Sequence, residues 1–357
     1  MNRLAHLQRT LIRNMEDNID YPAVEFNLLD YNSADGLGEW VRANLRQYID
    51  AGILKYYHTS HPPFFDRSHS KNMLFRLASG DIVCNVDADN YTGKGFAYFL
   101  NRRFQESGQD CIMIPERVVR DEEDRNTYGR ICIPKPLFLR TNGFDEKMVG
   151  YGFEDTDLIH RVKQQGAEER FITDRDFLGS ISHSHRMRVS EDELTRELDT
   201  VLIAYINHYC SRVIFLLKNG LYEIATFFDL TIARCLPRIP EGVDLAPGTE
   251  TYEVAIPEDQ REEGRWERNG ERLVLTAVGH TELLGSVGGN FFEGPGGQRW
   301  LPVTDSALVD QLVYVYPQIK NRNRMDANLT AGRKVNACGF GIGRVELNFT
   351  GDFVELQ

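Results

Sequence analysis

The sequence lacks the long hydrophobic runs that mark membrane proteins and exported proteins. Its longest continuous apolar stretches cover only 201–206 and 213–217, whereas a membrane-spanning helix needs roughly 20 apolar residues. The first residues, MNRLAHLQRTLIRNM, have the periodicity of an amphipathic helix and lack the continuous apolar core of a signal peptide. We therefore expect a cytoplasmic protein with no transmembrane segment.

Cysteine is sparse, and its spacing suggests no disulfide framework. Six cysteines are spread over 357 residues, none of them in a CxxC pair, and most have apolar neighbours. This pattern is typical of buried free thiols in a reducing compartment.

The sequence also has no excess of positive charge. Lysine and arginine number 41 against 53 aspartates and glutamates, which gives a formal net charge of −12. With no basic stripe along the chain, an extended nucleic acid is a poor candidate partner. A single nucleotide is still compatible, because a divalent metal and a few local cations can neutralise its phosphates.

The length and the patterning predict more than one folded part. A single hydrophobic core seldom extends beyond roughly 250 residues. Short apolar runs alternate with helical periodicity over 1–181, which predicts an α/β architecture. We expect an α/β domain over 1–236 with a helical extension over 190–236, a proline-bearing linker over 237–250, and a glycine-containing β-rich module over 251–357.

The first motif with chemical content follows a predicted strand over 81–86. That strand ends in the sequence Asn-Val-Asp-Ala-Asp-Asn, which places Asp87 and Asp89 at its carboxyl edge. Hard carboxylate oxygens of this kind suit Mg²⁺ or Mn²⁺. Such a metal would stabilise the charge that develops on a departing nucleoside diphosphate. A DxD motif is common by chance, and its place directly after an apolar strand is what favours this function.

A second acidic motif follows a glycine-rich turn. Glu154, Asp155 and Asp157 come directly after the segment Gly-Tyr-Gly-Phe at 150–153. Three acidic residues at a helix start could simply complement the helix dipole. The glycines, however, let the backbone pass close to a ligand, and Tyr151 offers an aromatic face on which a sugar can stack. A carboxylate at the helix start can also serve as a general base.

Together these segments resemble a known family. MNRLAHLQRTL, NVDADN, NGFDEKMVGYGFEDTDLIHRV and HSHR occur in the order and approximate spacing seen in the beta-1,4-galactosyltransferases and the related bacterial family 2 glycosyltransferases of GT-A fold. The resemblance covers about residues 1–190. It implies a GT-A-like, Rossmann-like domain that transfers a sugar from a nucleotide-sugar donor to a hydroxyl acceptor such as a glycan, with inversion and with a divalent metal. A UDP-sugar is the expected donor, and polysaccharide biosynthesis is the expected setting.

The resemblance implies a metal site and a catalytic pair. Asp89 would bind Mn²⁺ or Mg²⁺ together with His183, and His185 is a close alternative. Two histidines in an HxH pattern on a strand share one face of that strand. The alternative is that both are ordinary surface histidines with no role in metal binding. Asp155 would deprotonate the acceptor hydroxyl, and Glu154 would hydrogen-bond sugar hydroxyls. The related retaining enzymes usually have asparagine at the position of Asp155, which is why this residue indicates inversion.

The resemblance also implies an acceptor contact at Tyr151 and a set of donor contacts. A solvated helix face explains the donor candidate Lys71 equally well. The residues expected to bind the nucleotide or donor are Asn2, Arg3, Asp30, Asn32, Lys71 and Asp87. The family's enzymes have an apolar strand immediately before the segment that matches MNR. Here the sequence begins at Met1, so we expect a start further upstream or another segment in that place.

Two other functions fit the same motifs. A nucleotidyltransferase or phosphotransferase could also use a DxD motif at a strand edge, although it would not need Tyr151 and the glycine-rich turn. A non-catalytic carbohydrate-binding protein derived from a glycosyltransferase would retain the sugar site without turnover.

Overall fold

The protein is described by a computed structural model that covers residues 1–108, 110–116, 126–207, 210–228 and 262–357. The chain divides into two compact units. Unit 1 consists of Met1–Ser184 and Pro317–Gln357, and unit 2 consists of His185–Tyr316. The second border between the units falls inside helix α11 (Ser306–Ala331). Within the described ranges, no helix is long and apolar enough to cross a membrane.

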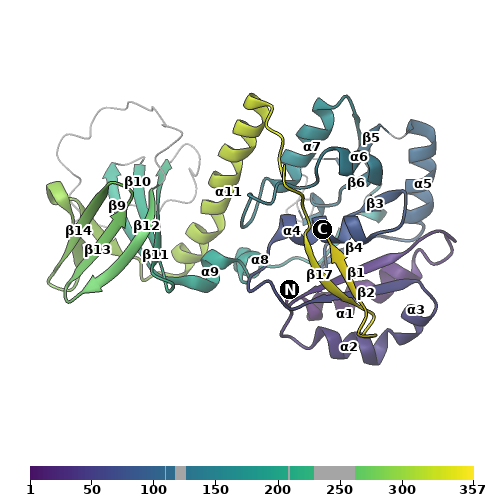
Figure 1. Cartoon of the computed structure of the whole chain (residues 1–357), viewed down its shortest axis with the longest axis horizontal. Helices are drawn as coiled ribbons and strands as arrows, with labels where there is room; N and C mark the ends of the chain where they lie inside the picture. Colours follow the sequence, from purple (N-terminus) through teal and green to yellow (C-terminus); the bar gives the residue numbers. More distant parts are fainter. Residues whose placement is uncertain (109, 117–125, 208–209, 229–261) are drawn as a thin grey trace. The chain divides into compact units, whose positions relative to one another are not determined.

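Unit 1 alternates helices and strands along most of its length (Figure 1). Its helices are α1 (Leu4–Glu16), α2 (Leu37–Asn44), α3 (Arg46–Asp50), α4 (Arg67–Leu77), α5 (Phe96–Ser107), α6 (Lys135–Arg140), α7 (Glu154–Gln164), the short 3₁₀ helix η2 (Arg175–Phe177) and the second half of α11. Its strands are β1 (Phe26–Tyr31), β2 (Leu54–Thr59), β3 (Ile82–Cys84), β4 (Asn90–Tyr91), β5 (Cys111–Pro115), β6 (Cys132–Pro134), β7 (Glu168–Ile172), β8 (Gly179–Ser180), β17 (Gly343–Leu347) and β18 (Phe353–Leu356).

The first sheet of unit 1 has the strand order β1-β2-β17-β18. β1 and β2 run parallel, and β17 lies antiparallel to β2. Apolar side chains of α1, α2 and α3 pack with Leu54 and Tyr56 of β2 on one face. Tyr57 of the same strand points the other way and packs with Met73 of α4, as the alternation of side chains along a strand requires.

The second sheet has the order β3-β6-β5-β7 and mixes parallel and antiparallel pairs. Ile112 and Ile114 of β5 pack with side chains of α4, α6 and α7, whereas Cys111 and Met113 pack with α5. Burial on both faces is expected for a sheet covered by helices on each side. The α/β architecture predicted for this part of the sequence is confirmed. None of the described cysteines forms a disulfide.

The C-terminal segment of the chain returns to unit 1. Strands β17 and β18 form a hairpin beside β1 and β2 (Figure 1). Asn348 accepts a hydrogen bond from the Tyr56 backbone N–H at 2.8 Å, and the Phe349 ring stacks on the Tyr56 ring with centroids 4.4 Å apart. The chain is therefore divided differently from the expected domains, because 317–357 belongs with the N-terminal α/β part and not with a separate C-terminal module.

Unit 2 is built around one closed antiparallel sheet (Figure 1). Its elements are α8 (His185–Val189), α9 (Glu193–Glu197), β9 (Leu198–Asn207), β10 (Cys210–Leu217), β11 (Leu221–Phe228), β12 (Glu262–Asn269), β13 (Arg272–Ala277), β14 (His280–Val287), β15 (Phe291–Glu293), η3 (Pro295–Gly297), β16 (Arg299–Pro302) and the first half of α11. Each strand pairs with the next, and β16 pairs with β9 to close the sheet as a barrel. Apolar side chains fill its core, with Tyr222 and Trp300 as the largest members.

The helical extension predicted over 190–236 is wrong for the described residues of that range. Among them α9 is the one helix, and the strands β9, β10 and β11 follow it. Continuous apolar runs do not distinguish a buried strand from a buried helix by periodicity, and the β-branched and aromatic residues in these segments favour strands. The β-rich prediction is confirmed for β12 to β16. The predicted linker over 237–250 lies outside the described residues.

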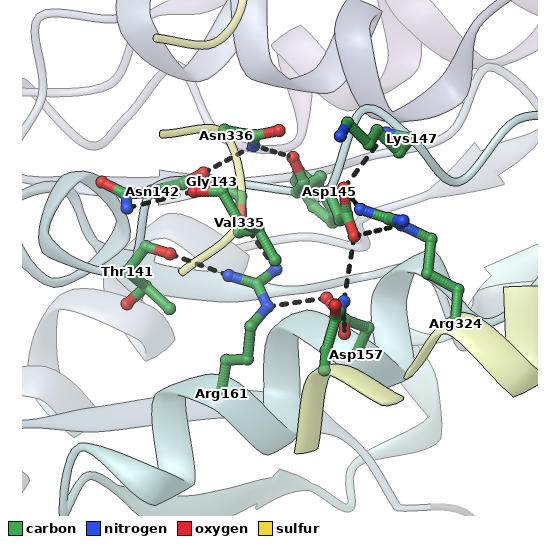
Figure 2. A network of polar contacts seen from close by, with 12 residues as sticks. Thr141, Asn142, Gly143, Asp145, Lys147, Asp157, Arg161, Arg324, Val335 and Asn336 are labelled. Carbon is green, nitrogen blue, oxygen red and sulfur yellow. Dashed lines mark hydrogen bonds and ion pairs between the residues drawn. The ribbon is translucent and has the colours of Figure 1, made fainter. Parts of the chain in front are cut away.

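A buried polar network joins the second half of α11 to the segment before α7 (Figure 2). Asp145, whose side chain is 0% exposed, accepts hydrogen bonds from Arg324 Nε at 2.6 Å and Nη2 at 3.1 Å. Asn328 donates to Asp145 at 2.9 Å and to Asp157 at 3.1 Å. Burial raises the pKa of Asp145, but the hydrogen bonds from Arg324 and Asn328 outweigh burial and leave this pKa below its usual value.

Arg161 of α7 extends the same network (Figure 2). Its guanidinium donates to Asp157 at 2.6 Å and to the carbonyl oxygens of Thr141 and Gly143, each at 2.8 Å. Asp157, near the start of α7, is thus held by Arg161 of the same helix and by Asn328 of α11.

We predict that Asp145→Asn destabilises unit 1 by about 1–3 kcal/mol, because the buried carboxylate is replaced and its charged hydrogen bonds with the partly exposed Arg324 guanidinium are lost. The matched control is Asp50→Asn, since Asp50 is 58% exposed and pairs with Arg46 on the surface; its effect should stay within about 0.5 kcal/mol. Hydrogen exchange of peptides covering 135–164, measured in the full chain, reports the change. Equal protection in the two variants would contradict the role assigned to this network.

Candidate active site

The first acidic motif is held at the end of β3. The Asn85 backbone N–H donates to the Ile131 carbonyl at 2.9 Å and so continues the pairing of β3 beyond Cys84. The Asn85 side chain donates to Asp87 Oδ1 and to the Gly129 carbonyl, both at 2.9 Å. These bonds fix the Asp87 carboxylate as the chain leaves the sheet.

The second acidic motif begins α7 after a turn of unusual backbone geometry. Gly150, Gly152 and Phe153 all have positive φ, at 81°, 102° and 69°. A Cβ atom at Gly152 would lie 2.7 Å from Cγ of Gln318, so this glycine is needed for both its conformation and its space. The Gly152 backbone N–H donates to Glu154 Oε2 at 3.1 Å. Carboxylates in this first turn also interact favourably with the helix dipole.

The two motifs meet beside Gly129, and Lys71 pairs with the carboxylates of the second motif. Lys71 of α4 places its Nζ 2.7 Å from Asp155 Oδ1 and 3.3 Å from Glu154 Oε1. A Cβ atom at Gly129 would lie 2.8 Å from Asp87 Oδ2 and 3.3 Å from Asp155 Oδ2. The carboxylates of Asp87 and Asp155 therefore converge on one point, which only a residue without a side chain can occupy.

The pKa values of Glu154 and Asp155 shift in opposite directions. Burial raises the pKa of Asp155 to about 7; the Lys71 ammonium opposes this change, and Glu154 adds to it. Burial also raises the pKa of Glu154, but Lys71 and Arg67 outweigh burial and leave it below its usual value. The adjacent carboxylates thus differ, with Glu154 ionised and Asp155 titrating near neutrality.

Asp89 contacts one of the two histidines expected to bind metal. The pairing of β4 with β8 brings the segment after β8 beside Asp89, and His183 Nε2 lies 2.5 Å from Asp89 Oδ2. The His6 ring of α1 packs edge-on against the His183 ring with centroids 5.6 Å apart. His185 begins α8 in unit 2, where its ring stacks on Tyr314. No cluster of three or more histidine, cysteine, aspartate or glutamate side chains suited to a metal ion occurs among the described residues.

Three of the expected donor residues meet at the turn after β1. Asp30 is 3% exposed; its carboxylate accepts from the Tyr56 hydroxyl at 2.7 Å and from the Ser33 backbone N–H at 2.9 Å. Asn2 contacts the same turn through its backbone N–H, which donates to the Ser33 hydroxyl at 3.1 Å. Asn32 follows with a φ of 53° and donates to the Pro62 carbonyl at 2.9 Å.

Tyr151 and Arg3, the two remaining candidates, lie in different parts of unit 1. Tyr151 lies in the glycine turn before α7, and the Arg67 guanidinium lies 5.2 Å from its ring centroid. Arg3 precedes α1 as its N-cap residue, and its charge contributes to lowering the pKa of His6 after the larger effect of burial.

Arg130 was missed in the sequence. Its side chain is 0% exposed, and Nη2 donates to Asn90 Oδ1 at 3.2 Å and to the Tyr91 carbonyl at 2.9 Å. Burial lowers the pKa of this guanidinium, opposed by the charges of Asp87 and Asp89 among others. The sequence feature that could have identified Arg130 is its place directly before an apolar strand, in GRICIP. The structure shows that this buried cation contacts the chain just after the DxD motif.

Part of the chain matches a known protein family. Residues 122–185 match the family model described as the N-terminal domain of galactosyltransferase. This range is well under half of the 357-residue chain, and it contains Glu154, Asp155 and His183. The match confirms the resemblance seen in the sequence and supports a glycosyltransferase enzyme. No curated protein is significantly similar to the chain.

Several solved structures are also similar. One is the mannosyltransferase PcManGT from Pyrobaculum calidifontis in complex with GDP-Man and Mn²⁺, with 20% identity, a TM-score of 0.39, and coverage of 48% of this chain and 52% of that chain. Another is TarS from S. aureus, with 16% identity, a TM-score of 0.37, and coverage of 45% and 52%. A third is the catalytic domain of Drosophila beta1,4-galactosyltransferase 7 in complex with xylobiose, with 16% identity, a TM-score of 0.32, and coverage of 48% and 75%.

The chain thus spans about half the length of the first two of these proteins. Since each TM-score is below 0.5, similarity of this degree establishes neither activity nor substrate.

Proposed function

We propose that the protein is a metal-dependent inverting glycosyltransferase that moves a sugar from a nucleotide-sugar, with a UDP-sugar as the expected donor, to a hydroxyl acceptor such as a glycan. The observation that carries the proposal is the convergence of Asp87 and Asp155 on Gly129. It joins a strand-edge DxD motif, suited to a diphosphate, to a carboxylate whose pKa lies near neutrality. The family match over 122–185 supports the same class of reaction.

Asp89 and His183 are the residues that would hold the metal. A carboxylate oxygen and an imidazole nitrogen are donors that Mn²⁺ accepts, and Mg²⁺ would use the carboxylate. In the structure the two side chains contact each other directly, so a bound ion would replace this contact. The bound ion would supply Lewis acidity that stabilises the leaving diphosphate. His185 would not be required, since its ring is engaged with Tyr314 in unit 2.

Asp155 is the proposed general base. It would accept the proton of the acceptor hydroxyl while the acceptor oxygen bonds to the anomeric carbon and the bond from that carbon to the diphosphate oxygen breaks. Attack from the side opposite the leaving group inverts the anomeric configuration. A base with a pKa near the working pH combines a usable ionised fraction with adequate basicity.

Glu154 and Tyr151 would bind the sugars. Glu154 stays ionised and is anchored by the Gly152 backbone N–H and by Lys71, so its carboxylate is pre-oriented to accept hydrogen bonds from sugar hydroxyls. Tyr151 would offer its ring to the acceptor. The donor's nucleotide would contact Asp87, Asp30, Asn2, Arg3 and Asn32.

We predict that Asp89→Ala abolishes both metal-dependent nucleotide binding and sugar transfer, because a carboxylate ligand is lost outright. Calorimetric titration of UDP with and without Mn²⁺ gives the binding, and product release gives the transfer. Asp110→Ala is the control, since Asp110 is 77% exposed in a surface ion pair. Full activity of Asp89→Ala in chelator-treated buffer without added metal would show that Asp89 has no metal role.

We predict that Asp155→Asn keeps the shape of the site and near-normal donor affinity but lowers the transfer rate by about 10²–10⁴-fold, the usual cost of losing a general base. Donor affinity and transfer are measured in one preparation, with the exposed Asp50→Asn as control. Near-normal transfer would overturn the base assignment. Lost donor binding would place Asp155 in the donor site instead.

We predict an acid limb near pH 7 in the profile of kcat/KM, because this ratio reports the ionisation of the free enzyme. The pKa of Asp155 is raised to about 7, so the base becomes protonated and inactive as the pH falls through that value. Below it, kcat/KM should fall about tenfold for each pH unit. A profile that stays flat down to pH 5 would exclude Asp155 as the titrating base.

A further inference from the structure

Lys71 has a position that its expected role does not explain. The sequence places it among the donor-binding residues, yet its ammonium faces α7, 2.7 Å from Asp155 Oδ1 and 3.3 Å from Glu154 Oε1. Its side chain is only 11% exposed. We propose that Lys71 is a positioning residue that holds the carboxylates of Asp155 and Glu154 in their working arrangement, and is not a ligand of the donor. This inference rests on the proposed function of Asp155 as the base.

The local structure directs Lys71 toward α7. The next residue, Asn72, is fully buried; it accepts from the Phe144 backbone N–H at 2.8 Å and donates to the Phe144 carbonyl and to Glu146, both at 2.9 Å. The Lys71 ammonium also lies 5.1 Å from the Phe144 ring centroid. α4 is thus fastened to the segment before α7 at the residue beside Lys71, which sets the direction of the lysine side chain.

The charges around Asp155 make this contact necessary. Glu154 faces it from α7, Asp87 faces it from the segment after β3, and Lys71 faces it from α4. Arg67, also on α4, acts on Glu154. Like charges held this close in a buried place repel one another, and a buried carboxylate without a partner is strongly disfavoured. Without the ammonium, Asp155 would take up a proton more readily and would be free to turn away.

The two roles for Lys71 predict different kinetic changes. A donor ligand contributes to binding, so its loss raises the Kd and KM for the donor. A positioning residue acts on the base, so its loss lowers kcat and moves the acid limb of the pH profile to higher pH. The direction follows because Lys71 lowers the pKa of Asp155, and removal of a cation raises the pH at which the carboxylate becomes ionised.

The test uses Lys71→Met and Lys71→Arg in the full chain, with Lys163→Met as matched control. Lys163 is an exposed lysine near the end of α7 that pairs with Glu169. Affinity for UDP is measured by calorimetry with Mn²⁺, and turnover of the best donor is followed from pH 5.5 to 9.

For Lys71→Met we expect a UDP Kd within about threefold of the parent, a kcat at pH 7 lowered at least tenfold, and an acid limb at higher pH with partial recovery in alkaline buffer. Lys71→Arg should keep the position of the limb. A tenfold rise in the UDP Kd with an unmoved limb would overturn the proposal, as would a Lys71→Met enzyme indistinguishable from Lys163→Met.

Two checks distinguish a failure of the Lys71 proposal from misfolding of the variant and from a failure of the function proposed for Asp155. If Lys71→Met is not folded by circular dichroism, Lys71→Gln takes its place: an acid limb at higher pH with unchanged UDP affinity supports positioning, and an unmoved limb overturns it. Asp155→Asn is assayed alongside. Normal transfer by that variant would disprove the base, whereas an inactive Asp155→Asn with an unshifted Lys71→Met profile would disprove only the role of Lys71.

Discussion

The site depends on holding several carboxylates close together in a buried place. Asp87 lies far in the sequence from the adjacent residues Glu154 and Asp155, and the mutual repulsion of the three carboxylates favours separation. Two features oppose this separation: the Lys71 ammonium, which pairs with Glu154 and Asp155, and the absence of a side chain at Gly129. Burial, with this repulsion added to it, raises the pKa of Asp155 to about 7, while Lys71 and Arg67 keep Glu154 ionised.

A rigid frame is needed to keep such groups in register, and here it is assembled from both ends of the chain. Asn321 on α11 donates to the Gly152 carbonyl at 2.9 Å, next to Tyr151. Deeper in unit 1, Arg324 and Asn328 satisfy Asp145 and tie it to Asp157. A catalytic arrangement needs supports of this kind, because small misplacements of reacting groups lower rates sharply. The segment 317–357 is therefore part of unit 1 and supports the candidate site.

The sequence predicted features whose causes are local. The strand before Asp87, the helix start at Glu154 and the α/β alternation follow from short patterns that the structure retains. Features that depend on distant partners were not predictable. Nothing in the local sequence says that Lys71 faces α7. The HxH pattern gave no sign that His183 and His185 belong to different units. The apolar runs in 198–217 fit a helix pair as well as strands until their partners were known.

We propose that these carboxylates serve sugar transfer and not another phosphate chemistry. The most direct measurement incubates the purified chain with Mn²⁺ and a panel of UDP- and GDP-sugars beside nucleoside triphosphates, with and without chelator, and follows the products by mass spectrometry. The account predicts that at least one sugar nucleotide releases its nucleoside diphosphate, only when metal is present, while the triphosphates stay intact. Consumption of a triphosphate, with every sugar nucleotide unchanged, would contradict it.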